Sequence, residues 1–165
     1  MRRVAQVLLW LMGAYVAWLA MMAVHEAGHV LHAWATGGRV VRVELPLVGF
    51  SRTDVSPNLR PAVVAWGGPV WGCLLPLAAW MVCPRRPRRA RITLQLFAGF
   101  CLIANGVYLG VGWIDNAGDA GDLLRRGTPV WVLVGFGLLA SGGGLYLWHR
   151  LGPVQEPRQE PQPSS

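Results

Sequence analysis

Long apolar stretches separated by short polar segments make up most of this chain. Four of them run approximately over Val4–Val24, Ala62–Cys83, Ile92–Ile114 and Thr128–Trp148, and none contains Asp, Glu, Lys or Arg. A helix needs about 20 apolar residues to cross a bilayer. The pattern therefore predicts an all-α, multi-pass membrane protein with about four transmembrane helices, formed by residues 1–150.

The segment between the first two spans has a different pattern. The helical pattern of the first span continues to about Ala35, and Gly37 and Gly38 end it. Residues 39–55 are rich in β-branched residues, alternate in part, and are interrupted by a Pro and a Gly. This predicts a short β-hairpin or edge strand between the first and second spans. Residues 151–165 are rich in Pro, Gln, Glu and Ser, which predicts a disordered tail.

Composition and charge agree with a membrane location. Hydrophobic residues make up 53% of the chain, too many for an ordinary soluble fold. All basic residues are Arg, which together with the many Ala and Gly residues is typical of a GC-rich bacterial genome. We therefore expect a multi-pass protein of a bacterial plasma membrane.

The net charge of +7 is concentrated in a short loop between two spans, and no aromatic residue interleaves with its Arg residues. This arrangement favours an anchor on the cytoplasmic side or a contact with anionic lipid over binding of nucleic acid. The cluster consists of Arg85, Arg86, Arg88, Arg89 and Arg91.

Residues 25–29 read His-Glu-Ala-Gly-His and continue the first apolar span. His25 and His29 are four residues apart, so on a helix both imidazoles can reach one zinc ion. Glu26 lies beside them, where it could take a proton from the attacking water. Ionisable side chains within a membrane are costly unless they have a partner or a metal. The pattern predicts a zinc site; a buried His/Glu hydrogen-bond cluster that holds helices together is the alternative.

A catalytic zinc commonly has three protein ligands and an open position for water. His32 shares the helical face, but it is seven residues from His25, about 10 Å along the axis. We therefore expect His32 to contact the surroundings of the site or a helix interface. The acidic segment 115–122, which we expect to form the loop after the third span, offers better third ligands. A solvated acidic turn at the N-terminus of the next helix is the alternative there.

Three segments resemble the site-2 protease family of intramembrane zinc metalloproteases. They are His25-Glu26-Ala27-Gly28-His29 with Ala33, Gly37-Gly38 and the alternating strand; Gly67-Gly68-Pro69 at the start of the second span; and Gly118-Asp119-Ala120-Gly121-Asp122-Leu123-Leu124. The resemblance implies a Zn²⁺ cofactor with His25, His29 and Asp119 as ligands, and Glu26 as the catalytic base.

The chain departs from the family at more than one feature, and Ala120 stands where the family has a Gly after the Asp. The family's Asn-x-x-Pro before the third ligand is not recognisable, and Asn105 and Asn116 are the candidates for a substrate contact or a contact around the site. Asp122 remains the alternative third ligand.

The expected function is hydrolysis of peptide bonds in or near transmembrane segments of membrane proteins. The substrate would unwind locally and pair with the strand-like segment 39–55. Two alternatives remain: a non-proteolytic membrane scaffold or partner-binding relative with a structural metal site, and an ion-handling protein that uses the His/Glu cluster as a relay.

Overall fold

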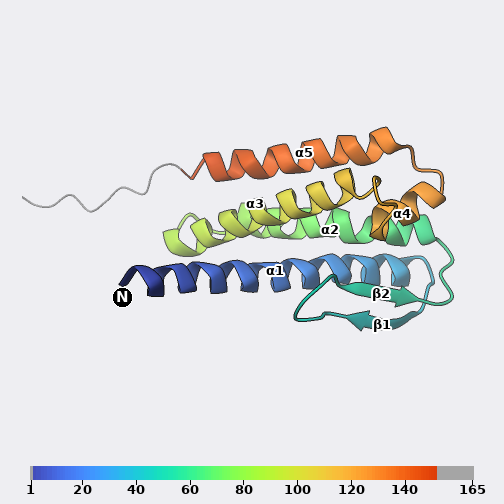
Figure 1. Ribbon diagram of the computed structural model, residues 1–165, viewed down its shortest axis with the longest axis horizontal. Helices are drawn as coiled ribbons and strands as arrows, with labels where there is room; N and C mark the ends of the chain where they lie inside the picture. The colour runs from blue at the N-terminus through green and yellow to red at the C-terminus, as the bar shows by residue number, and fades with distance from the viewer. Residues whose placement is uncertain (1, 152–165) are drawn as a thin grey trace, which may run out of the picture.

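The computed structural model describes residues 2–151, and four helices in this part of the chain are long and apolar enough to cross a membrane. Apart from Leu151, the tail expected over 151–165 lies outside the described residues. The elements, in order, are α1 (Arg2–Ala35), β1 (Val40–Glu44), β2 (Arg52–Val55), α2 (Pro61–Val82), α3 (Arg88–Val111), α4 (Gly118–Arg125) and α5 (Val130–His149) (Figure 1). The predicted helical membrane fold with a hairpin between the first two spans is confirmed.

The hairpin follows directly from the way α1 ends. Gly37 adopts a left-handed conformation with φ +74°, and the Gly38 N–H donates to the carbonyl of Ala33 at 2.7 Å. This pattern is typical of a helix C-terminus, where only glycine adopts a positive φ at no steric cost. β1 and β2 then pair antiparallel, with Val43 opposite Thr53.

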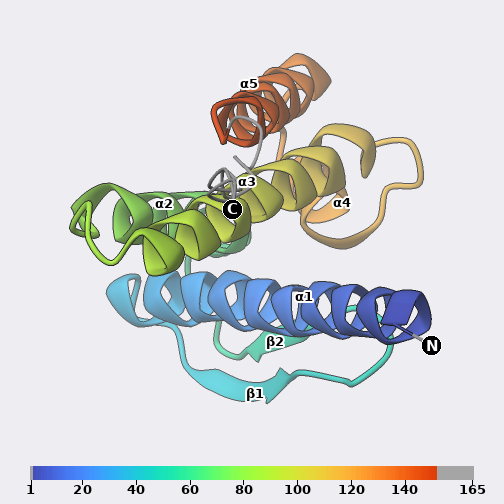
Figure 2. The same ribbon diagram turned by 90° about the vertical axis from the view of Figure 1, so that its left-hand side faces the viewer.

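The elements form layers. The hairpin covers one side of α1, the pair α2 and α3 covers the other side, and α5 packs on α3 farthest from the hairpin (Figures 1 and 2). The first turn of α1, the connection between α2 and α3, and the last turn of α5 lie at one end of the molecule (Figure 1). The hairpin base and α4 lie toward the opposite end, where the second half of α1 runs.

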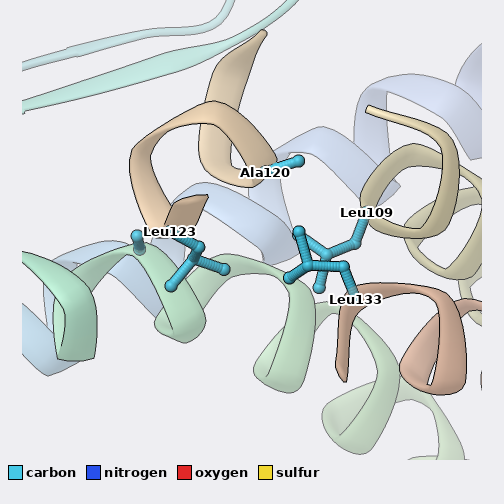
Figure 3. Packing of buried hydrophobic residues seen from close by; sticks show 5 residues of the cluster. Leu109, Ala120, Leu123 and Leu133 are labelled. Carbon is cyan, nitrogen blue, oxygen red and sulfur yellow. The ribbon is translucent and has the colours of Figure 1, made fainter. Parts of the chain in front are cut away.

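One short helix was not predicted. The acidic segment expected as a loop contains α4, whose Ala120 and Leu123 are fully buried. They pack in a cluster with Ala65 of α2, Leu109 of α3 and Leu133 of α5 (Figure 3). This burial of apolar side chains explains why the segment is helical and holds α4 against the membrane-crossing helices.

Glycines set the distance between α1 and α2. A Cβ on Gly28 would collide with the backbone carbonyl of Gly67 and would lie 2.9 Å from the Cβ of Trp71. Small residues at such crossings allow helix backbones in membranes to approach closely. The second half of α1, which carries the His-Glu pentad, is therefore packed directly on the start of α2.

We expect Gly28→Ala to destabilise the fold by about 1–3 kcal/mol, because the added methyl group overpacks this crossing. Gly13→Ala is the matched control: it lies on the same helix, and a Cβ there would meet nothing within 4 Å. Its effect should stay within about 1 kcal/mol. Denaturant unfolding of both variants in one detergent measures the difference, and equal effects would contradict a close crossing at Gly28.

Candidate metal centre

His25 and His29 lie one turn apart in the second half of α1 and direct their imidazoles to the same point. Their Nε2 atoms are 3.1 Å apart, and each residue is only 7% exposed. Two imidazoles buried this deeply in an apolar helix require specific polar partners, because unpaired polar groups are costly away from water.

Asp119 of α4 supplies a carboxylate to this pair. Its Oδ2 lies 3.0 Å from the Nε2 of His25, and its Oδ1 lies 3.3 Å from the Nε2 of His29. Burial alone would raise the pKa of the Asp119 carboxyl, but its contacts with the two imidazoles lower that pKa to about 2. The carboxylate is therefore ionised at neutral pH. Asp122 does not reach the imidazoles; it pairs with Arg125 at 2.6 Å.

The other ring nitrogens lie beside oxygen acceptors, and the backbone N–H of Gly68 also contacts the Nδ1 of His29 at 3.3 Å. The Nδ1 of His25 is 2.6 Å from the Oδ1 of Asn105, whose amide nitrogen donates to the carbonyl of Cys101 at 2.9 Å. The Nδ1 of His29 is 2.7 Å from the carbonyl of Val64. If each Nδ1 is the donor, each neutral imidazole presents the lone pair of Nε2 to Asp119. Both Nε2 atoms and the carboxylate are then acceptors, which a cation held between them would satisfy: a proton shared between an imidazole and Asp119, or a metal ion in its place.

The space between the three groups suits a metal ion. One ligand atom from each of His25, His29 and Asp119 lies within 4.8 Å of the others. In a tetrahedral zinc site with metal–ligand distances of about 2.0–2.1 Å, the ligand atoms lie roughly 3.3 Å apart. The two Nε2 atoms and the nearest Asp119 oxygens here are 3.0, 3.1 and 3.3 Å apart. A Cβ on Gly68 of α2 would collide with both Nε2 atoms. Glycine at this position therefore leaves room on the side of the imidazoles that would face the ion.

Glu26 lies beside this group and is only 3% exposed. The hydroxyl of Thr53 on β2 donates to its Oε2 at 2.6 Å. Glu26 borders a cavity of about 690 Å³ that His25, His29 and Asp119 also line, called the polar cavity below. The carboxylate and the three metal-facing groups thus meet the same space.

Tyr108 of α3 joins several parts of the site. Its hydroxyl accepts a hydrogen bond from the backbone N–H of Asp119 at 3.2 Å, and its ring packs edge-on against His25 with 5.7 Å between centroids. Phe50, in the loop of the hairpin, stacks on the same ring at 6.4 Å. Sequence reasoning missed Tyr108 and Thr53, because an aromatic or a hydroxyl in an apolar chain carries no signal of its own, and it found Gly68 only as part of the motif over 67–69.

The remaining candidates lie elsewhere. His32 is in the interface between α1 and α2, where its Nδ1 is 2.7 Å from the carbonyl of Val63 and its Nε2 accepts from the indole of Trp71 at 3.1 Å. Asn116 is exposed, and its backbone carbonyl accepts from Arg125. Of the two candidate asparagines, the structure brings Asn105 to the imidazoles.

We expect Asn105→Ala to weaken zinc binding by about 10- to 100-fold, because groups that orient a ligating imidazole typically contribute that much. Titration with a competing chelator in detergent measures the affinity. Gln95→Ala is the matched control, since it removes a carboxamide from the same helix and a 2.8 Å hydrogen bond to the carbonyl of Leu147. Wild-type affinity in Asn105→Ala would show that this contact does not support the site.

Comparison with known proteins identifies the family. The model of the Peptidase M50B-like family matches residues 3–109, which include the His-Glu pentad, the glycines of α2 and Asn105. No curated protein matches the chain. No solved structure matches it either. The family match covers more than half of the sequence and agrees with the resemblance of the pentad, and the chain therefore belongs to the Peptidase M50B-like family, which is of the site-2 protease kind.

Proposed function

We propose that this protein is an intramembrane zinc metalloprotease that hydrolyses peptide bonds in or near transmembrane segments of membrane proteins. Membership of the family supports a membrane metalloprotease of the site-2 type. The observation that carries the proposal is the convergence of His25, His29 and Asp119 beside Glu26 on the wall of the polar cavity. The cofactor we propose is Zn²⁺, held by His25, His29 and Asp119.

The open side of the site favours catalysis over a structural metal. Structural zinc sites are usually closed by four protein ligands, whereas catalytic sites have three and an open position. In the part of the chain that the structure describes, the group contains three metal-ligating side chains, and all three border the polar cavity. A zinc ion bound there would act as a Lewis acid toward water and toward the scissile carbonyl.

Glu26 is the proposed general base and general acid. Thr53 engages one carboxylate oxygen, Oε2, and so fixes the side chain against the hairpin. The other oxygen remains for proton transfer: it accepts a proton from the attacking water and returns it to the leaving amine. Glu26 follows His25 directly on α1 and borders the same cavity as both imidazoles.

The substrate we propose is an unwound segment of a membrane protein. An intact helix shields its peptide carbonyls in internal hydrogen bonds, so it must open before attack. β2 borders the polar cavity through Arg52, Thr53 and Val55 and pairs on one side with β1. An extended substrate could therefore add to β2 by main-chain hydrogen bonds next to Glu26. The location we propose is a bacterial plasma membrane, with the protein crossing it several times.

We expect Glu26→Gln to retain zinc and the fold but to reduce cleavage at least about 100-fold, because the amide cannot take the proton. The assay is cleavage, in liposomes, of a reporter that carries one transmembrane segment. His29→Ala is the comparison: it should lose zinc as well as cleavage.

Undiminished cleavage by zinc-loaded Glu26→Gln would rule out this assignment of the base. Full zinc content together with no cleavage by the wild-type protein, over a panel of membrane segments, would instead support a non-proteolytic relative with a structural metal.

A further inference from the structure

A second cavity adjoins the proposed catalytic group on the side away from α4. It has a volume of about 250 Å³, and its apolar wall is formed by Trp18, Met21 and Met22 of α1 and by Phe100 and Ala104 of α3. We call it the apolar cavity. α1 packs mainly on α2 and touches α3 little, which leaves this space between the two helices.

The apolar cavity and the polar cavity meet at the catalytic group. Both are bordered by His25, Glu26 and Tyr108, together with Phe50 and Ser51 of the hairpin loop. Along α1, Trp18, Met22 and Glu26 follow each other at intervals of four residues, so they share one helical face. A group bound in the apolar cavity would therefore lie within one or two helical turns of Glu26.

The walls suit an apolar ligand of limited size. The indole N–H of Trp18 donates to the sulfur of Met22 at 3.2 Å, so it is turned to a protein partner rather than to the cavity. Methionine side chains are flexible and polarisable and adapt to apolar partners of different shape. A protein cavity of about 150 Å³ can hold a benzene molecule. The larger volume here accommodates a leucine or phenylalanine side chain.

We propose that the apolar cavity binds a large apolar side chain of the substrate, next to the scissile bond, and thereby selects the cleavage position. The inference rests on the proposed protease function. The occupant we propose is a substrate side chain because the apolar cavity shares His25, Glu26 and Tyr108 with the polar cavity, where the substrate backbone would lie. Cleavage then requires a Leu- or Phe-like residue at one flank of the bond, in a segment that can unwind.

The test is a series of transmembrane reporters in liposomes with Gly, Ala, Leu, Phe or Trp at either flank of the cleaved bond. The wild-type protein should cleave the Leu or Phe reporter at least about 10-fold faster than the Gly reporter at one flank, as is typical for an apolar specificity pocket. Ala104→Phe fills the cavity and should lower cleavage of the Leu and Phe reporters about 10-fold while sparing the Gly and Ala reporters. Phe100→Ala enlarges the cavity and should improve cleavage of the Trp reporter.

Val107→Phe is the matched control, because it adds the same ring to α3 at a side chain that is 50% exposed. It should not change the preference. A wild-type protein that cleaves all reporters equally, or an Ala104→Phe variant that slows all of them alike, would overturn the pocket while leaving the protease. Failure of the wild-type protein to cleave any reporter would refute the proposed function and this inference with it.

A second measurement does not need turnover. Glu26→Gln is mixed with a reporter that carries a benzophenone side chain at the selected flank, and the mixture is irradiated. Cross-links should fall within residues 18–22 or 100–104, and Ala104→Phe should reduce them. Cross-links confined to other segments, or a lipid that occupies the cavity and is not displaced by the reporter, would overturn the proposal.

Discussion

Ionisable side chains in an apolar helix must be matched by partners, and this requirement organises the second half of the molecule. His25, Glu26 and His29 are nearly inaccessible to water, so any polar atom without a partner would destabilise the fold. The neighbouring elements supply these partners: α2 the carbonyl of Val64 and the backbone N–H of Gly68, α3 the amide of Asn105, and β2 the hydroxyl of Thr53. α4 supplies the only carboxylate that reaches the imidazoles within the described residues.

The same arrangement places both Nε2 atoms beside the Asp119 carboxylate, and at Gly68 there is no Cβ, which would collide with them. A divalent cation held there would satisfy all three groups at once. The hairpin and Tyr108 then divide the space around the site into a polar side near α4 and an apolar side between α1 and α3. The proposed cleavage of apolar segments by water would use both sides.

Much of the fold could be predicted from the sequence, because the membrane imposes simple patterns. The four long helices could be predicted from apolar spans without charged residues. The hairpin could be predicted from Gly37-Gly38 and the β-branched segment that follows. α4 was expected as a loop, since eight residues are too few for a periodic pattern and its buried Ala120 and Leu123 have partners only in the folded molecule. The pentad and its glycine-rich neighbour on α2 could be found because they are short motifs.

Periodicity alone could not predict the surroundings of the site: Asp119 came from the family resemblance, Asn105 was one of two candidates, and Thr53 was missed. The contacts of His25 with Asn105 and with Asp119 join residues 80 and 94 positions apart, and Thr53 is 27 positions from Glu26. Sequence patterns express local periodicity, and they do not show which distant residues a tertiary fold brings together. The choice between Asp119 and Asp122 illustrates this. They are three residues apart on one short helix, yet the burial of α4 turns the first toward the imidazoles and leaves the second paired with Arg125.

Zinc content therefore tests the account most directly, measured by metal analysis on the purified wild-type protein beside Asp119→Ala and Asp122→Ala. We expect one zinc ion per chain in the wild type and in Asp122→Ala. Asp119→Ala should lose most of its zinc, because Asp119, and not Asp122, faces the imidazoles. A wild-type protein that holds no zinc after purification with zinc present, or an Asp119→Ala variant that retains it in full, would contradict the account.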